Sequence, residues 1–171
     1  MFRYPKETFI YSKAKARAEE VVRQKSKNYI ILRPGEIYDE NDDKMITAQN
    51  ILDYMRQPAF AIDGGVSVTS RPAVAKAIVR AAETPLSNKL YSLGGENITI
   101  GELARITQEL CGKGHIYLEL PYDFAMFAIK LLSRLHIKIM EEEAVKYGGF
   151  CWFMDSSAAK QDLGYDVQDA K

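Results

Sequence analysis

The sequence predicts an α/β fold built on a mostly parallel sheet. Short, nearly continuous apolar runs alternate along the chain with longer segments that carry an apolar stripe at helical spacing. This alternation is typical of parallel strands joined through helices. No internal repeat or low-complexity segment interrupts the pattern. The chain has 171 residues, 47% hydrophobic and 27% charged, which is enough to bury one core and is typical of a globular protein.

An amphipathic helix and a buried strand are the first two predicted elements. A helix is predicted over 9–27, and its apolar stripe consists of Ala14, Ala18, Val21 and Val22. The run 29–32 is almost wholly apolar, which favours a strand buried on both faces of a parallel sheet. Arg33, Pro34 and Gly35 end this strand, because proline donates no ladder hydrogen bond and glycine permits a sharp turn.

The next elements continue the alternation up to residue 98. The first of them is a helix over 45–55, and strands over 60–62 and 66–68 follow on either side of a hairpin or turn signal at 63–65. A helix is then predicted over 72–83, with Val74, Ile78 and Val79 facing inward, and a strand over 89–93. Pro72 suits the first position of its helix, because a helix start needs no amide donor there. Gly94 and Gly95 close the last of these strands.

From Thr99 onward the pattern becomes mainly helical. Thr99 and Glu102 predict a capping box, and Gly112 suits the left-handed residue that ends a helix. The elements expected here are a helix over 101–111, a strand over 116–118, a helix over 122–137 and a helix over 156–163 ended by Gly164. The change in pattern predicts two domains, 1–98 and 99–171.

Charge and cysteine content exclude several classes of protein. The 23 basic and 23 acidic side chains leave no basic surplus for a phosphate backbone, so we expect no nucleic-acid partner. Cys111 and Cys151 have neither metal spacing nor disulfide density, and His115 and His136 lack partners at metal spacing, so no metal is expected. Charged residues interrupt the apolar stretch 124–140, and no signal peptide is visible, which favours a cytoplasmic protein without an integral membrane segment.

Tyr11 and Lys15 form the most suggestive pair for chemistry. They lie four residues apart on the predicted first helix and therefore share a face. A lysine ammonium beside a phenol favours the phenolate, which makes a tyrosine usable as an acid or base at neutral pH. With 10 tyrosines in the chain, the same spacing also arises by chance about once, so spacing alone leaves a purely structural pair open.

The wider context of this pair resembles the extended short-chain dehydrogenase/reductases, also known as the NAD-dependent epimerase/dehydratase family. In that family the catalytic helix reads Tyr-x-x-x-Lys, then alanine and glutamate, then an apolar pair, as in residues 11–22. Residues 29–38 resemble its strand with an Arg-Pro turn, and 70–82 and 90–96 its next helix and strand. Residues 99–121 and 155–165 resemble its small substrate domain, so the resemblance covers nearly the whole chain.

The resemblance implies a partial Rossmann-like sheet, followed by a small, mainly helical substrate domain, and a role for each matching residue. Tyr11 would be the acid/base toward a substrate hydroxyl or carbonyl, and Lys15 would activate it and hold the nicotinamide ribose. Pro34 and Gly35 would lie against the nicotinamide of NAD or NADP. The substrate would be a nucleotide sugar or another small hydroxy/keto compound. Arg71 is either a contact for an anionic substrate group or an exposed charge near a helix cap.

Several positions depart from the family pattern. The glycine-rich pyrophosphate turn is absent, as is the catalytic serine or threonine that precedes the tyrosine. Asp39 stands where glycine often follows the Arg-Pro strand, and Ala73 where aspartate is expected. The chain is therefore predicted to be the carboxy-terminal portion of such an enzyme, without most of the nucleotide-binding half. We expect that alone it neither binds the dinucleotide tightly nor turns over.

Two other classes of protein remain open. One is a non-catalytic scaffold or regulatory protein that keeps the fold, and the other is an independent binding module with a coincidental Tyr-x-x-x-Lys. A homodimer is compatible with each of them. For the helix over 122–137, packing over the substrate cleft is expected, with a membrane-surface role as the alternative.

Overall fold

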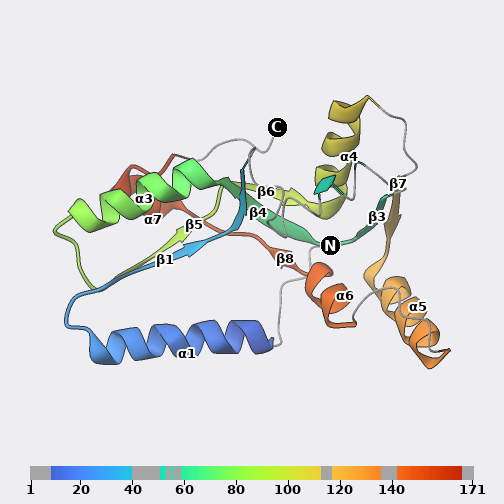
Figure 1. Cartoon of the computed structure of the whole chain (residues 1–171), viewed down its shortest axis with the longest axis horizontal. Helices are drawn as coiled ribbons and strands as arrows, with labels where there is room; N and C mark the ends of the chain where they lie inside the picture. The colour runs from blue at the N-terminus through green and yellow to red at the C-terminus, as the bar shows by residue number, and fades with distance from the viewer. Residues whose placement is uncertain are drawn as a thin grey trace.

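The computed structural model describes residues 9–39, 51–52, 55, 59–112, 117–135 and 142–166. Its elements are α1 (Ile10–Lys25), β1 (Ile30–Pro34), β2 (Glu36–Tyr38), β3 (Ala59–Ile62), β4 (Gly65–Ser70), α3 (Arg71–Glu83), β5 (Lys89–Leu93), β6 (Glu96–Thr99), α4 (Ile100–Cys111), β7 (Tyr117–Leu120), α5 (Tyr122–Arg134), α6 (Glu142–Gly148), β8 (Cys151–Trp152) and α7 (Ser157–Leu163) (Figure 1). The predicted α/β class is confirmed. The helix predicted over 45–55 lies almost entirely outside the described residues.

The strands form three small sheets where the sequence predicted one. β1 pairs with β5 in parallel, β3 pairs with β7 in parallel, and β4 lies between β2 and β6 and also pairs with β8. Among the strands that the structure describes, only the β4–β6 pair is antiparallel, so the described sheets are mostly parallel as predicted. The hairpin alternative at 63–65 is wrong, because β3 and β4 belong to different sheets.

Helices lie on both sides of the β1–β5 pair. α3 and α7 pack on one side, and α1 lies on the other (Figure 1). Ile30 and Leu32 of β1 pack against the α3–α7 core, whereas Arg33 pairs with Glu19 of α1. The prediction that β1 is buried on both faces is wrong, because residues 30–32 are half-buried and no residue of α1 is buried.

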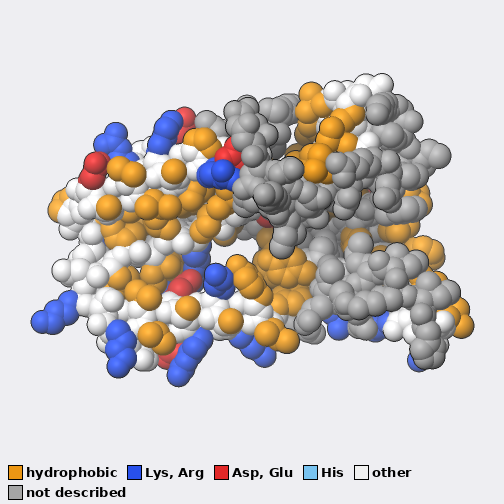
Figure 2. Space-filling view, viewed as in Figure 1, with side chains coloured by type: hydrophobic (Ala, Val, Ile, Leu, Met, Phe, Trp, Pro, Cys, Tyr) orange, Lys and Arg blue, Asp and Glu red, His pale blue; other side chains and the backbone are white. Residues whose placement is uncertain are grey.

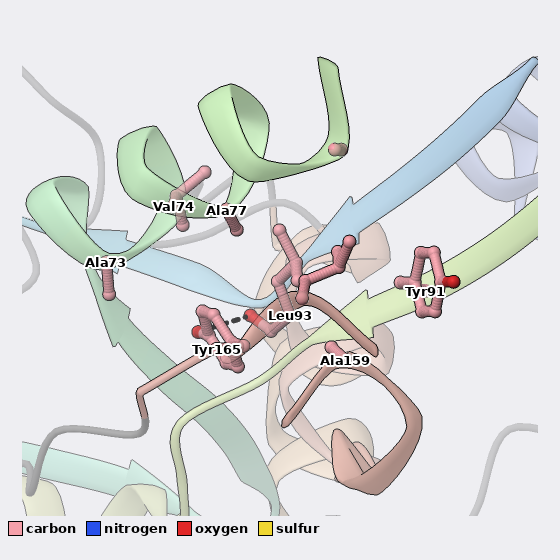
Figure 3. Packing of buried hydrophobic residues seen from close by; sticks show 9 residues of the cluster. Ala73, Val74, Ala77, Tyr91, Leu93, Ala159 and Tyr165 are labelled. Carbon is pink, nitrogen blue, oxygen red and sulfur yellow. Dashed lines mark hydrogen bonds between the residues drawn. The ribbon is translucent and has the colours of Figure 1, made fainter. Parts of the chain in front are cut away.

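The largest core cluster joins α3 and β5 to α7 and the segment after it (Figure 3). It consists of Ala73, Val74, Ala77, Ala81, Tyr91, Leu93, Ala159, Leu163 and Tyr165. The Tyr165 hydroxyl donates to the Leu93 carbonyl at 3.2 Å, which fixes the segment after α7 against β5. The carboxy-terminal segment therefore completes the core of the first half, while the boundary at 98/99 stays a prediction.

α3 presents small residues to this core. Ala73, Ala77 and Ala81 recur at i+4 spacing and let the helix approach β1 and β4 closely. The prediction that Ile78 and Val79 face inward is therefore wrong, since they are 53% and 55% exposed. Val74 is buried as predicted.

The helix-capping signals are confirmed. Thr99 and Glu102 form the predicted capping box on α4, with the Glu102 amide donating to Thr99 Oγ1 at 3.1 Å. Gly112 and Gly164 adopt left-handed conformations with φ of 59° and 60° at the ends of α4 and α7. β2, β6 and β8 were not predicted, because each is only two to four residues long, and β2 and β6 each begin directly after a glycine.

α5 confirms the predicted helix from residue 122, and the described helix ends at Arg134. Ala125 and Met126 are buried against Val145 of α6, whereas Phe127 is 65% exposed. The structure therefore leaves both the cleft-packing and the membrane-surface interpretations of this helix open. None of the helices in the described ranges has the length and apolar character that crossing a bilayer requires.

Tyr91 gives the core a pH-dependent contact. Burial raises its pKa to about 12, and the hydrogen bond and negative charge of Asp162 add to this, with the hydroxyl donating to Oδ2 at 2.8 Å. A raised pKa favours the neutral phenol in the fold, so stability should fall as the pH rises from about 10 to 12, where only the unfolded chain ionises. We expect Tyr91→Phe to reduce this alkaline loss in urea denaturation curves. An identical pH profile in the variant would contradict the assignment.

Candidate functional site

Tyr11 and Lys15 lie together at the beginning of α1, as their spacing predicts. The Lys15 ammonium lies 5.3 Å from the centroid of the Tyr11 ring, within the range of a cation–π interaction. Tyr11 is 62% exposed, so a ligand could reach its hydroxyl without a rearrangement of the core. The pair therefore has the proximity that acid/base chemistry needs, while its catalytic role stays a prediction.

An ion pair ties α1 to β1 and sets the position of this pair. Arg33 donates from Nε and Nη2 to the two carboxylate oxygens of Glu19, at 2.6 and 2.7 Å. The Arg33 hydrogen bond is the main cause that lowers the pKa of Glu19, and Arg23 adds a further contact at 3.0 Å. Because α1 has no buried residue, this bidentate contact is a principal link between the helix and the sheet.

Pro34 is the last residue of β1, and Gly35 follows it. The structure gives Gly35 a packing role. Its amide donates to the Leu93 carbonyl at 3.1 Å, and a Cβ atom at this position would overlap the Ser67 carbonyl oxygen of β4. The glycine is therefore required by the close approach of β4. Contact of Pro34 and Gly35 with a nicotinamide stays a prediction.

Arg71 contacts an acidic residue of the same chain. Its guanidinium lies 2.8 Å from a carboxylate oxygen of Asp39. The two positions link the end of β2 to the start of α3, so Asp39, a departure from the family pattern, has a structural partner here. Ala73, the other departure, is buried in the core, and Ser70 supplies the helix cap by accepting from its amide at 3.3 Å. A substrate contact for Arg71 stays a prediction.

A group of aromatic side chains, which we call the aromatic cluster, lies beside the Tyr11 end of α1. It consists of Phe9, Tyr122, Tyr147, Phe150 and Trp152. The rings of Tyr147 and Trp152 stack at 4.3 Å with an interplanar angle of 17°. Phe9 lies against both rings, at 5.5 and 5.6 Å between centroids. Phe9 is the residue before α1, so the aromatic cluster brings the start of α1 to the α6–β8 segment.

Glu36 and Tyr147 are site residues that the sequence did not indicate. Burial raises the pKa of the Glu36 carboxyl, opposed by a hydrogen bond from the Tyr38 hydroxyl at 3.0 Å. Burial also raises the pKa of Tyr147, with smaller contributions from the charges of Glu36 and Tyr11. The concentrated apolar run 149–154 predicts core, a pocket wall or a surface bared by a missing half, and it is the sequence signal for this part of the site.

The chemistry of the described residues can be compared with the needs of a nicotinamide dinucleotide, whose contact with this chain stays a prediction. Tyr11 and Lys15 offer a phenol and an ammonium, which suit a ribose and a reacting oxygen. The glycine pairs within the described ranges serve other purposes. Gly64 and Gly65 pack against Gly148 and the Phe153 ring, and Gly95 packs against Val68. The part of the chain that the structure describes therefore contains no turn suited to the pyrophosphate.

Comparison with known proteins gives a consistent result for the fold. No family model and no curated protein matches the chain, but solved structures do. The protein gox2253 is 26% identical with a TM-score of 0.71, over 91% of this chain and 49% of that one. A nucleoside-diphosphate-sugar epimerase from Pseudomonas aeruginosa is 22% identical with a TM-score of 0.76, over 97% and 52%. A UDP-glucuronic acid 4-epimerase from Bacillus cereus, solved with UDP-glucuronic acid and NAD, is 18% identical with a TM-score of 0.66, over 97% and 50%.

The chain has the fold of the extended short-chain dehydrogenase/reductases. The resemblance predicted from residues 11–22 and 29–38 is thereby confirmed at the level of the fold. The chain spans about half the length of these structures. The other half of each of these structures has no counterpart in the match. The activity, substrate and cofactor of this chain are therefore proposals.

Proposed function

We propose that this chain supplies the acid/base helix and the substrate side of an NAD(P)-dependent oxidoreductase, epimerase or dehydratase. Its substrate is a nucleotide sugar or another small hydroxy/keto compound. The observation that carries the proposal is the Lys15 ammonium 5.3 Å from the Tyr11 ring, at the exposed start of a helix in this fold. Loss of turnover by the catalytically complete protein when the Tyr11 hydroxyl is removed tests it.

In the proposed reaction, Tyr11 exchanges a proton with the substrate. As the phenolate, it accepts the proton of a substrate hydroxyl during oxidation, and as the phenol it returns a proton to a carbonyl oxygen during reduction. The Lys15 ammonium lies over the Tyr11 ring, and the Glu19–Arg33 ion pair links α1 to β1. The nicotinamide, when bound, supplies the hydride chemistry.

A further polypeptide segment would complete the nucleotide-binding sheet. Within the described residues, β1 pairs only with β5, so one edge of β1 lacks a strand partner. Exposed apolar side chains lie on the helices of both flanks, including Ile10 and Val21 of α1 and Ile78 and Val79 of α3 (Figure 2). An open parallel edge between two apolar helix faces suits one more strand and its crossover helix.

We therefore expect the 171-residue chain alone to show no micromolar affinity for NAD(H) or NADP(H) in titration calorimetry. The physical reason is that the described residues offer a site for the ribose end and none for the pyrophosphate. The exposed apolar surfaces should bind a hydrophobic dye at the same time. Micromolar dinucleotide binding by the chain alone would contradict this proposal.

A non-catalytic scaffold that retains the fold is the second candidate. The altered positions Asp39 and Ala73 favour it, because Asp39 forms an ion pair with Arg71 and Ala73 is buried in the core. This candidate predicts that Tyr11→Phe leaves every measurable property of the protein unchanged. The acid/base proposal predicts the opposite for turnover.

A further inference from the structure

The first turn of α1 lacks the features that usually stabilise a helix start. Phe9 occupies the N-cap position, where its side chain accepts no hydrogen bond from the amides of the first turn, and that turn contains no acidic residue. No residue of α1 is buried in the core. A helix start of this kind frays unless a tertiary contact holds it. Tyr11 is the second residue of α1 and therefore lies in the turn that needs such a contact.

The Phe9 side chain makes a tertiary contact with three other rings of the aromatic cluster. Its centroid lies 5.5 Å from that of Tyr147, 5.9 Å from that of Phe150 and 5.6 Å from that of Trp152. The interplanar angles are 68°, 71° and 56°, so the pairs are edge-to-face or tilted, as aromatic rings favour. Phe9 thus connects the start of α1 to the segment 147–152.

The segment 147–152 is fixed by contacts of its own. β8 pairs with β4 in parallel, and the Gly65 amide donates to the Phe150 carbonyl at 3.1 Å. The indole Nε1 of Trp152 donates to the Tyr147 carbonyl at 2.9 Å, which holds the indole against the end of α6. None of these contacts involves α1, so the rings that Phe9 meets are held in place independently of the helix.

The Glu19–Arg33 ion pair is a second attachment of α1, and it lies further along the helix. Glu19 is ten residues after Phe9, which corresponds to about 15 Å along a helix axis. The ion pair therefore restrains the middle of α1, whereas the ring contacts of Phe9 restrain its start. Because Tyr11 is two residues from Phe9 and eight from Glu19, its position depends more on the Phe9 contact.

We propose that Phe9 is a positioning residue for Tyr11, and that its contact with the rest of the aromatic cluster lets the segment 147–152 control the geometry of the acid/base helix. This inference rests on the proposed function. With the Phe9 ring in contact, the first turn of α1 is formed and Tyr11 stays beside Lys15. Without this contact, the first turn unwinds part of the time, and the Tyr11 hydroxyl loses its fixed place relative to the substrate.

Amide hydrogen exchange of the 171-residue chain tests the contact without any turnover. The Lys13 amide donates to the Phe9 carbonyl at 2.9 Å and so reports on the first turn. We expect Phe9→Ala to speed its exchange by about tenfold, because the variant loses the aromatic contacts that oppose fraying. The Ser26 amide donates to the Val22 carbonyl at 2.9 Å at the other end of α1, and its exchange rate should not change.

The fluorescence of Trp152 gives a second readout of the same contact. Trp152 is the single tryptophan of the chain, and loss of the Phe9 ring exposes one side of its indole to water. The emission of Phe9→Ala should therefore shift to longer wavelength, whereas Phe9→Tyr keeps the ring and should preserve both the emission and the Lys13 exchange rate. Phe127→Ala is the matched control, since it removes an exposed phenylalanine of α5 outside the aromatic cluster and should change neither.

Turnover of the catalytically complete protein distinguishes positioning from stabilisation. Phe9→Ala should lower kcat by about tenfold and change KM by less than about twofold, because Phe9 acts on the placement of Tyr11 and not on substrate binding. Phe9→Tyr should restore kcat, since it restores the ring.

An unchanged Lys13 exchange rate in Phe9→Ala would refute the contact, as would a rise at Ser26 as large as that at Lys13. A normal kcat in a variant with fast Lys13 exchange would refute the positioning role, and so would a Phe9→Tyr protein that behaves like Phe9→Ala. Failure of the proposed function is a separate result. If Tyr11→Phe keeps full turnover, the acid/base assignment fails, whereas the exchange and fluorescence results for the Phe9 contact stand.

Discussion

Replacing Tyr11 by phenylalanine is expected to lower kcat of the catalytically complete protein by about 10²–10⁴-fold, the usual contribution of a general acid/base. The variant keeps the aromatic ring beside Lys15 and loses only the hydroxyl that exchanges the proton. Because Tyr11 is 62% exposed, thermal unfolding should be unaffected. The measurement is steady-state turnover of the sugar substrate, with the unfolding curve of the same preparation alongside.

Two lysines on α1 provide the matched control for this experiment. Lys15→Met removes the ammonium 5.3 Å from the Tyr11 ring and should also reduce kcat strongly. Lys13→Met removes another exposed charge from the same helix without changing that contact, and it should leave kcat unchanged. Retained turnover in Tyr11→Phe, or equal effects of the two lysine changes, would exclude the acid/base assignment.

The Tyr11–Lys15 pair could be predicted because its geometry is local. Two residues four apart on a helix share a face whatever the rest of the chain does. The contacts of Phe9 with Tyr147 and Trp152 could not be predicted in this way, since these residues are more than 100 positions apart in the sequence and meet only through the fold. The Glu19–Arg33 ion pair is an intermediate case. The Arg-Pro turn indicated the position, but only the pairing of α1 with β1 shows its partner.

The same distinction holds for the fold. The caps at Thr99 and Gly112 depend on neighbouring residues and were predicted correctly. The division into three sheets depends on which distant strands pair, and the apolar runs do not carry that information. The prediction of which α3 residues face inward was wrong for Ile78 and Val79. The sequence pattern favours large apolar residues, whereas the core contains the alanines that allow close packing.

Replacing Gly35 by alanine is expected to lower the free energy of unfolding by about 3 kcal/mol, at the upper end of the usual cost of overpacking. The new methyl group would overlap the Ser67 carbonyl oxygen, a backbone atom of β4 that cannot rotate away. Relief would require β1 and β4 to separate, which would also lengthen the hydrogen bond from the Gly35 amide to Leu93. Urea denaturation of the variant measures the loss.

Alanine variants at two other glycines serve as controls, because they distinguish the cost of steric overlap from the cost of backbone strain. At Gly148 an added Cβ meets only the Ile62 side chain at 3.9 Å, so alanine there should be neutral or mildly stabilising in α6. At Gly112 the space is open but φ is +59°, so alanine should cost about 1 kcal/mol. A Gly35→Ala protein as stable as the Gly148 variant would show that β4 does not require the glycine. If it then lost dinucleotide affinity in the complete enzyme, Gly35 would be a cofactor contact.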